Sequence, residues 1–225
     1  RAMDIPYVVN QWWASVVAAK QRAPYYLELL RERGYPDYTE QYSAISLGSL
    51  FDPDPENAPW GGLPRPSIVL GENVGDGGRK VFDVWGQHPD ITFYALESAA
   101  ENTVPVNWWD LMPHDWEKAI GTARLDLMVS ELTGLIRFLE TTTGRVFSER
   151  RLRRVLDLVN EQAEWNRRSR DLIAATTPTP LAVTDSIPSV MIPQWHRGTE
   201  WARDAARRFY EEVAERVRAG AAVCE

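Results

Sequence analysis

Cysteine and histidine are scarce in this chain, which has one Cys and three His among 225 residues. The single cysteine, Cys224, excludes an intramolecular disulfide and a multi-cysteine metal site within this chain. The histidines, His88, His114 and His196, are far apart and lack the i, i+4 spacing of a helical metal pair. We therefore expect no metal or cofactor to be bound by this chain alone.

Long apolar runs and an excess of basic charge are also missing. No stretch reaches the roughly 18 uninterrupted apolar residues that a membrane span needs, and the N-terminus lacks the pattern of a secretory signal. A net charge of −7 and a pI near 5.1 do not favour binding to a phosphate backbone. We expect a soluble cytoplasmic protein with no membrane segment and no nucleic-acid partner.

Familiar catalytic and nucleotide-binding motifs are absent as well. Without a G-x-S-x-G elbow or a Cys-His pair, nucleophilic hydrolase chemistry has no support. "ENVGDGG" (72–78) is rich in glycine like a phosphate-binding turn, but it matches neither common phosphate motif, and an ordinary strand-to-helix turn is the simpler interpretation. His114 has Asp115 as an adjacent carboxylate, yet a structural role for this histidine is also the simpler interpretation.

The first half of the sequence alternates between strand-like and helix-like segments. Short apolar runs predict strands at 5–10, 67–71 and 91–97. Helix formers predict helices at 12–33, divided or kinked at Pro24, and at 79–87. This alternation predicts an α/β fold with a small parallel sheet in Rossmann-like or flavodoxin-like order.

One segment of this half is ambiguous. "EQYSAISLG" (40–48) has a strand-like apolar stretch after an acid and an amide, and it precedes a proline-rich loop at 51–66. It is either the end of a buried strand or the rim of a site.

From about residue 115 apolar residues recur at helical spacing. Gly144 closes the first helix, Ser148 is the N-cap of the second, and a third begins near Thr199. Arginines on one face of the second helix could receive the phosphates of a nucleotide-like ligand, although a solvated charged face is the simpler interpretation. We predict an α/β domain over 1–114 and a helical segment over 115–225 packed on it.

Candidate binding residues follow two of the predicted strands. Ligands of parallel α/β sheets bind outside the carboxyl ends of the strands. Asn10, Gln11 and Trp12 follow the first strand, and Asn73 and Asp76 follow the second, so we expect these five to line a substrate site. Trp13 points about 100° away from its neighbour on a helix, so at most one of the two tryptophans lines a pocket.

Four stretches, in this order, carry a resemblance to a known family. They are "IPYVVNQWWA", "GYPDYTEQYSAISLG", "LPRPSIVLGENVGDGGRKVFDVW" and "LTGLIRFLETTTGRVFSERRLRRVLDLVNEQAEWNRRSRDLI". The chain resembles the 2-hydroxyacyl-CoA dehydratase and benzoyl-CoA reductase family of radical enzymes, in particular subunits of the 2-hydroxyglutaryl-CoA dehydratase D-component type. The resemblance covers about residues 4–220.

The resemblance implies α/β subunits in which three cysteines hold a [4Fe–4S] cluster near the substrate thioester. It also implies an ATP-dependent activator that injects one electron. Many relatives have a cysteine at the place of Glu40, in a "CSY"-like motif, and another at the place of Gly75; this chain has neither. The comparison implies a cluster held by a partner subunit, and it makes Glu40, Tyr42 and Ser43 the candidate catalytic residues.

The resemblance is to the first half of such a subunit only. It implies a homologous second subunit, a missing C-terminal half, or both, in a complex that acts on an acyl-CoA or related substrate by one-electron chemistry. Two alternatives stay open. The chain is a cluster-free, non-catalytic partner that stabilises an active homologue, or it is a redox-independent enzyme in which Glu40 acts as acid or base.

Overall fold

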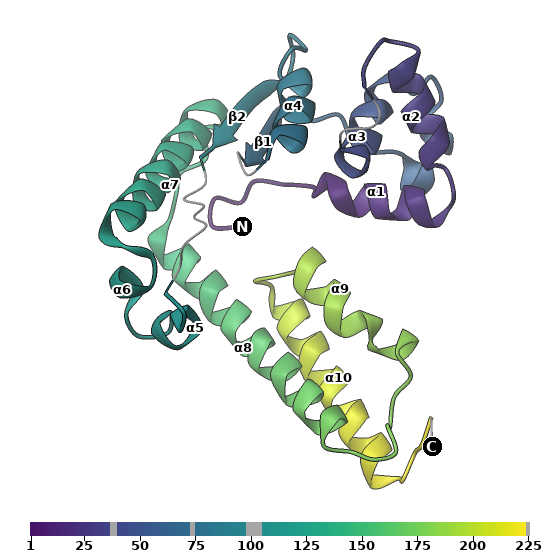
Figure 1. Ribbon diagram of the computed structural model, residues 1–225, viewed down its shortest axis with the longest axis vertical. Helices are drawn as coiled ribbons and strands as arrows, with labels where there is room; N and C mark the ends of the chain where they lie inside the picture. Colours follow the sequence, from purple (N-terminus) through teal and green to yellow (C-terminus); the bar gives the residue numbers. More distant parts are fainter. Residues whose placement is uncertain (37–39, 73–74, 98–104, 224–225) are drawn as a thin grey trace. The chain divides into compact units, whose positions relative to one another are not determined.

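The computed structural model describes residues 1–36, 40–72, 75–97 and 105–223 (Figure 1). They form two compact units, which we call the N-terminal unit (Tyr7–Thr142) and the C-terminal unit (Thr143–Glu225 with Arg1–Pro6). The N-terminal unit contains α1 (Asn10–Ala19), α2 (Ala23–Arg31), α3 (Gln41–Gly48), β1 (Ile68–Glu72), α4 (Asp76–Trp85), β2 (Thr92–Leu96), α5 (Trp108–Leu111), α6 (Trp116–Ile120) and α7 (Thr122–Thr143). The C-terminal unit contains α8 (Glu149–Ala174), α9 (Ile187–Trp195) and α10 (Glu200–Arg218). The domain boundary at 114 stays a prediction.

The two strands form a parallel pair joined by α4, which confirms the predicted α/β fold. Ile68 lies opposite Thr92, and the register continues to Glu72 opposite Leu96. The helix between them begins at Asp76, three residues before the predicted start. Two strands do not define a sheet order, so the Rossmann-like or flavodoxin-like arrangement stays a prediction.

The predicted first strand at 5–10 is wrong. The chain before Asn10 forms no strand, and Tyr7 and Val8 are 51% and 59% exposed. Val9 is extended (φ −92°, ψ 109°) but serves as the N-cap of α1. β-branched residues favour an extended backbone, yet a strand also needs a neighbour to pair with, and none pairs with this segment among the described residues.

Of the two alternatives left open for 40–48, the end of a buried strand is wrong, because this segment is the helix α3. All six residues from 43 to 48 are buried, since α1 and α2 pack against the helix and α4 contacts it as well. A helix buried all round shows no polar face, and its sequence then cannot be distinguished by periodicity from a buried strand. The ambiguity of "EQYSAISLG" thus follows from its central position in the N-terminal unit.

Two clusters of apolar side chains meet at α3. Ile45 packs in a cluster with Trp13 and Tyr26, from α1 and α2. Leu47 belongs to the other cluster, with Trp85 of α4. Of the two alternatives predicted for 12–33, a divided helix and not a kinked one is observed. Pro24 lies in the first turn of α2, where its missing N–H breaks no helical hydrogen bond.

The predicted end of α7 and the predicted starts of α8 and α10 are confirmed. Gly144 has a φ of +67° after α7, the Ser148 hydroxyl accepts a hydrogen bond from the Arg151 N–H, and the Thr199 hydroxyl accepts one from the Ala202 N–H. The segment between α8 and α10 contains α9, which was not predicted and has Pro193 inside it.

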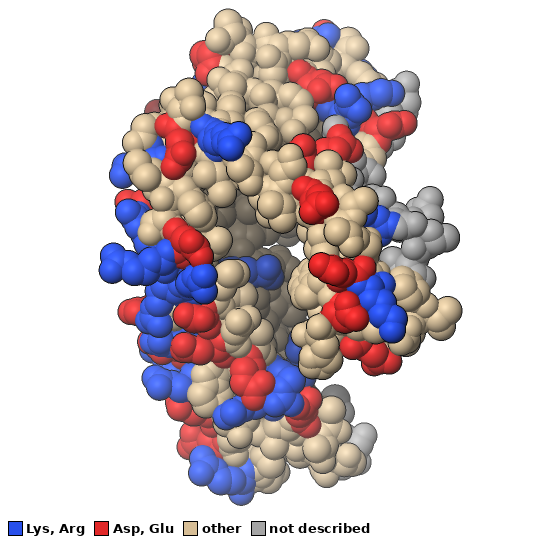
Figure 2. Space-filling model, turned by 90° about the vertical axis from the view of Figure 1, so that its left-hand side faces the viewer, with Lys and Arg blue, Asp and Glu red and all other residues tan. Residues whose placement is uncertain are grey.

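Helices α8 and α10 run side by side in the same direction, and α9, which lies between them in the sequence, packs against both (Figure 1). Arg154 pairs with Glu200 near the start of both helices, and Trp165 lies 5.5 Å from Tyr210 further along. Acidic and basic side chains are intermingled on the face drawn in Figure 2. Within the described residues, no helix is long and apolar enough to cross a membrane.

Candidate functional site

Three of the predicted site residues come together where α1 packs against α3. The Ser46 hydroxyl donates a hydrogen bond to the Asn10 carbonyl at 3.0 Å. The Ser15 hydroxyl donates to the Gln11 carbonyl at 2.9 Å and also contacts the Tyr42 hydroxyl. A hydroxyl has one proton to donate, so Tyr42 is the donor in its contact with Ser15. We call these five residues the α1–α3 cluster.

The α1–α3 cluster arises from helix packing and not from the sheet edge that the sequence pattern indicated. Ser15 and Ser46 were not among the predicted site residues. The signal that could have indicated them is a small hydroxyl residue in the second turn of each helix, which allows the two helices to approach closely. Tyr42 remains 42% exposed, so the cluster presents a phenol and the exposed Gln11 side chain to a surface.

Glu40 and Ser43 flank this cluster at the start of α3. Glu40 occupies the N-cap position and is half-buried, but its side chain makes no capping hydrogen bond. Its carboxylate is therefore not committed to the helix end. Ser43, one turn further, is buried.

The two adjacent tryptophans have different environments. Trp13 is a core residue: its indole N–H donates to the Pro59 carbonyl at 3.0 Å, and its ring meets Tyr26 edge-on at 5.0 Å. Trp12 is half-buried. Of the pair, Trp12 alone stays a candidate for a binding surface.

Asp76, from the second group of predicted binding residues, is not joined to the first group among the described residues. Asp76 lies in the exposed first turn of α4, just beyond the carboxyl end of β1. Within the described ranges, no hydrogen bond or ion pair links it to the α1–α3 cluster. Asn73 lies outside the described residues. Gathering all five residues at one edge required a strand before Asn10, which the protein does not have.

A carboxylate beside the core also organises two tyrosines that the sequence pattern did not indicate. Asp52 accepts hydrogen bonds from the hydroxyls of Tyr25 at 2.9 Å and Tyr26 at 3.0 Å, and from the Asp54 N–H at 3.0 Å. Burial, and then the bond to Asp52, raises the pKa of Tyr26 above its ordinary value. The bond to Asp52 is the main cause that raises the pKa of Tyr25. Both phenols are held neutral as donors, which suits a structural role.

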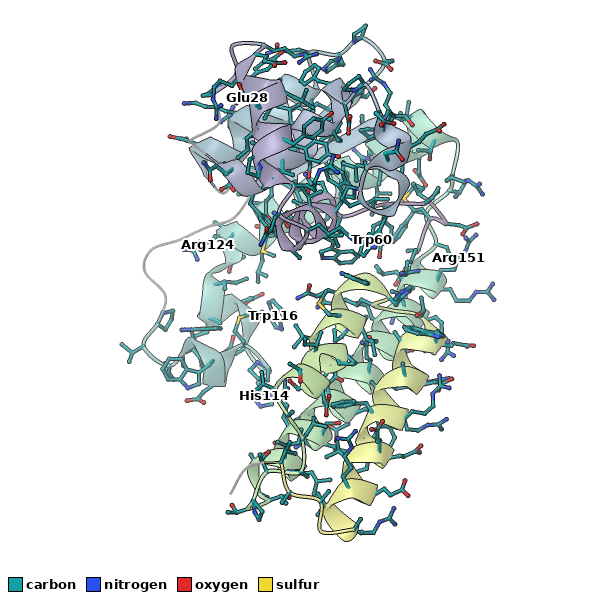
Figure 3. The ribbon with its side chains drawn as sticks, turned by 90° about the vertical axis from the view of Figure 1, so that its right-hand side faces the viewer. Glu28, Trp60, His114, Trp116, Arg124 and Arg151 are labelled. Carbon is teal, nitrogen blue, oxygen red and sulfur yellow. The ribbon has the colours of Figure 1, made fainter. Side chains whose placement is uncertain are left out.

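Among the described residues, no carboxylate is hydrogen-bonded to His114 or His196, the two histidines near tryptophan. The Asp115 side chain accepts from the Lys118 N–H at 3.1 Å and so caps α6. Figure 3 shows His114 and Trp116 on the segment that carries α5 and α6. The ring of His196 lies 4.6 Å from that of Trp201. The ring contact supports a structural interpretation of His196, and Asp115 serves as a helix cap next to His114.

Comparison with known proteins now identifies the class of this chain. A family model for the 2-hydroxyglutaryl-CoA dehydratase D-component matches residues 1–225, and the chain therefore belongs to this family. It is similar to the (R)-phenyllactyl-CoA dehydratase alpha subunit of Clostridium sporogenes, with 22% identity over 220 residues, 97% of this chain and 49% of the relative. The chain spans about half the length of this curated relative. No solved structure matches it significantly.

The residues at hand do not fit an iron–sulfur cluster. Such clusters are held mainly by cysteine thiolates. The one cysteine, Cys224, lies outside the described residues, and Glu40 and Gly75 stand where the resemblance places thiols. Among the residues that the structure describes, no group of three or more His, Cys, Asp or Glu side chains is arranged to hold a metal ion.

Proposed function

We propose that this chain is one subunit of a 2-hydroxyacyl-CoA dehydratase-like or benzoyl-CoA reductase-like complex, which acts on an acyl-CoA thioester by one-electron chemistry in the cytoplasm. The family match over all 225 residues carries the proposal. The similarity to a protein named as an alpha subunit supports a multi-subunit assembly.

In this proposal a homologous partner chain holds the iron–sulfur cluster, and an ATP-dependent activator supplies the electron. The scarcity of cysteine supports this division, since one thiol does not provide the ligands of a [4Fe–4S] cluster. The α1–α3 cluster then contributes hydrogen bonds to the substrate. Its phenol and amide are neutral groups that orient a thioester without competing for the electron.

The test is to express the chain with a homologous family subunit and the activator. The purified complex is supplied with ATP, a reductant and (R)-phenyllactyl-CoA or another 2-hydroxyacyl-CoA thioester. We expect ATP-dependent dehydration and about four irons per complex, with none retained by the chain expressed alone. Iron bound by the chain alone, or an iron-loaded complex that does not turn over any such thioester, would contradict the proposal.

The Glu40 carboxylate supports a second candidate, a redox-independent enzyme in which this residue is the acid or base. General acid–base catalysis contributes about 10²- to 10⁴-fold, so Glu40→Gln should lower turnover by at least 100-fold in that case. Glu28→Gln is a matched control, because Glu28 is exposed on α2 and pairs with Arg31 (Figure 3). Unchanged turnover in Glu40→Gln rejects this candidate.

The non-catalytic alternative predicts a different outcome for the α1–α3 cluster. If the chain only stabilises an active homologue, Tyr42→Phe leaves kcat and KM of the complex unchanged. A substrate-binding role predicts a raised KM for the same variant. The two roles are thus separated by steady-state kinetics of the complex.

A further inference from the structure

A cleft of about 460 Å³ lies between α8 and α9 in the C-terminal unit. Along α8 it is lined by one stripe of side chains, namely Val159, Gln162, Ala163, Asn166 and Arg170. Its other lining residues are Ser189, Val190, Pro193, Gln194 and Arg197. Small-molecule sites are commonly of this size and combine apolar walls with a few polar groups. None of these lining residues belongs to the α1–α3 cluster.

Two amide side chains in the wall of the cleft have unmet hydrogen-bonding groups. Gln162 is 2% exposed and Asn166 is 8% exposed. In the part of the chain that the structure describes, Gln162 Nε2 and Asn166 Oδ1 have no hydrogen-bond partner. Each buried group without a hydrogen-bond partner lowers the stability of the fold by about 1–3 kcal/mol, so a pair of such groups indicates a function such as ligand binding. They offer one donor and one acceptor.

Those two groups suit a ligand that carries a secondary amide. The amide carbonyl accepts from Gln162 Nε2, and its N–H donates to Asn166 Oδ1. The terminal torsions of Gln and Asn are soft, so both groups can turn towards the cleft at little energetic cost. On the facing wall, Pro193 has no N–H to donate to the Ser189 carbonyl, which adds a further acceptor.

The cleft also has positive charge that no carboxylate of the described residues neutralises. On α8, Arg153, Arg154, Arg167 and Arg168 each form an ion pair with a carboxylate. Arg170 and Arg197, which line the cleft, form no such pair among the described residues. A guanidinium group binds phosphate oxygens with two parallel hydrogen bonds. The cleft therefore favours an anionic ligand.

We propose that this cleft binds the phosphorylated pantetheine arm of a CoA thioester. The arm places secondary amides and methylene groups in one chain that ends in phosphate. Gln162 and Asn166 hold an amide, Val159 and Val190 contact the methylenes, and Arg170 and Arg197 bind the phosphate. The inference rests on the proposed function, which names an acyl-CoA as the substrate.

Isothermal titration calorimetry of the 225-residue chain tests the assignment, with coenzyme A, pantetheine and adenosine 3′,5′-bisphosphate as probes. We expect coenzyme A to bind, and Gln162→Leu and Asn166→Leu each to weaken it at least tenfold. Arg170→Gln should weaken coenzyme A but not pantetheine, which lacks the phosphate. Arg167→Gln is the matched control, because Arg167 lies on the same helix and pairs with Glu164 away from the cleft residues.

Thermal unfolding of the same variants distinguishes a binding role from a structural one. If the amides serve only to bind a ligand, the leucine variants should leave the Tm of the ligand-free chain unchanged or raise it. If the amides instead hydrogen-bond to buried water as part of the structure, the same variants should lower the Tm. The exposed Arg170→Gln change carries no folding risk, so it remains informative even if a leucine variant fails to fold.

Three results would overturn the assignment. They are a lack of coenzyme A binding by the unaltered chain, binding that the leucine and Arg170→Gln variants leave unchanged, or binding of adenosine 3′,5′-bisphosphate with the same affinity as coenzyme A. Dehydration by the complex is measured separately. A complex that turns over while the cleft variants bind coenzyme A normally would reject the cleft alone and leave the proposed function in place.

Discussion

The Tyr26 hydroxyl provides a sharp test of the N-terminal unit, because it is wholly buried and has a charged partner. Its side chain is 0% exposed, and it donates to Asp52 at 3.0 Å. Tyr26→Phe removes this hydroxyl and keeps the ring that packs on Trp13. Hydrogen bonds to charged groups contribute about 1.5–3 kcal/mol. Asp52 keeps its bonds from Tyr25 and Asp54, so the lower part of this range applies, about 2 kcal/mol.

For a chain of this size, 1 kcal/mol shifts Tm by roughly 2–4 °C, so Tyr26→Phe should lower Tm by roughly 4–8 °C. Urea unfolding followed by circular dichroism measures the same change at 25 °C. Tyr25→Phe is the matched control, since it removes a hydroxyl from the same carboxylate at a half-exposed position. Its effect should be at most half as large, because water replaces the lost bond.

The pH dependence gives a second measure of the same interaction. The pKa of Tyr26 is raised in the folded chain, so the unfolded chain loses this proton first as the pH rises. The stabilisation is therefore complete below about pH 10, the ordinary tyrosine pKa, and declines above it. Tyr26→Phe should flatten the fall in unfolding free energy above pH 10 relative to the unaltered chain. Equal destabilisation by both tyrosine variants, with identical alkaline profiles, would refute this account.

Two further predictions concern a glycine contact and an ion pair. A Cβ at Gly48 would lie 2.5 Å from the Tyr26 carbonyl oxygen, so Gly48→Ala should cost about 1–3 kcal/mol in urea unfolding. Gly78→Ala meets nothing within 4 Å and should be neutral or stabilising; similar losses in both variants would contradict the packing argument. The Arg65 guanidinium lowers the pKa of Asp90 to about 2. Arg65→Gln should therefore raise the pKa of Asp90 towards its ordinary value in an NMR titration. An unchanged pKa would show that the ion pair does not form in solution.

The elements that the sequence predicted well are those with local signals. Ser148 and Thr199 accept the hydrogen bonds that cap α8 and α10, and Gly144 adopts the positive φ that ends α7. The strand pair could also be located, because each strand is a short apolar run bounded by turn residues. These features depend on neighbours within a few residues, so one sequence is enough to find them.

The wrongly predicted strand at 5–10 and the ambiguous segment at 40–48 both depend on contacts with residues that are distant in the sequence. The run at 5–10 has the composition of a strand but no partner strand among the described residues. The run at 40–48 is a helix surrounded by others, so tertiary burial removed the periodicity that distinguishes helix from strand. The candidate site shares this limit. Asn10, Gln11 and Tyr42 do meet, but through helix packing that no local pattern indicates.

The two amide side chains of the cleft illustrate a third limit on what the sequence alone can predict. Gln162 and Asn166 are one helical turn apart, in the same stripe of α8 as Val159 and Ala163. That spacing is visible in the sequence, and it places two polar residues among apolar ones. Only the structure shows that both are buried with unmet atoms beside a cleft, which turns an irregular helix face into a testable site.

Packing and function separate within "EQYSAISLG" itself. From Ser43 to Gly48 every residue is buried, and burial between α1, α2 and α4 accounts for small and apolar side chains there. Burial does not account for the first three residues. Gln41 and Tyr42 are exposed, and Glu40 is an N-cap residue whose carboxylate does not cap. A good N-cap residue with a shorter side chain would stabilise α3 better than glutamate does. Stability alone therefore does not explain Glu40 or Tyr42. The kcat and KM of the Glu40→Gln and Tyr42→Phe variants are the measurements that test whether this helix has a function.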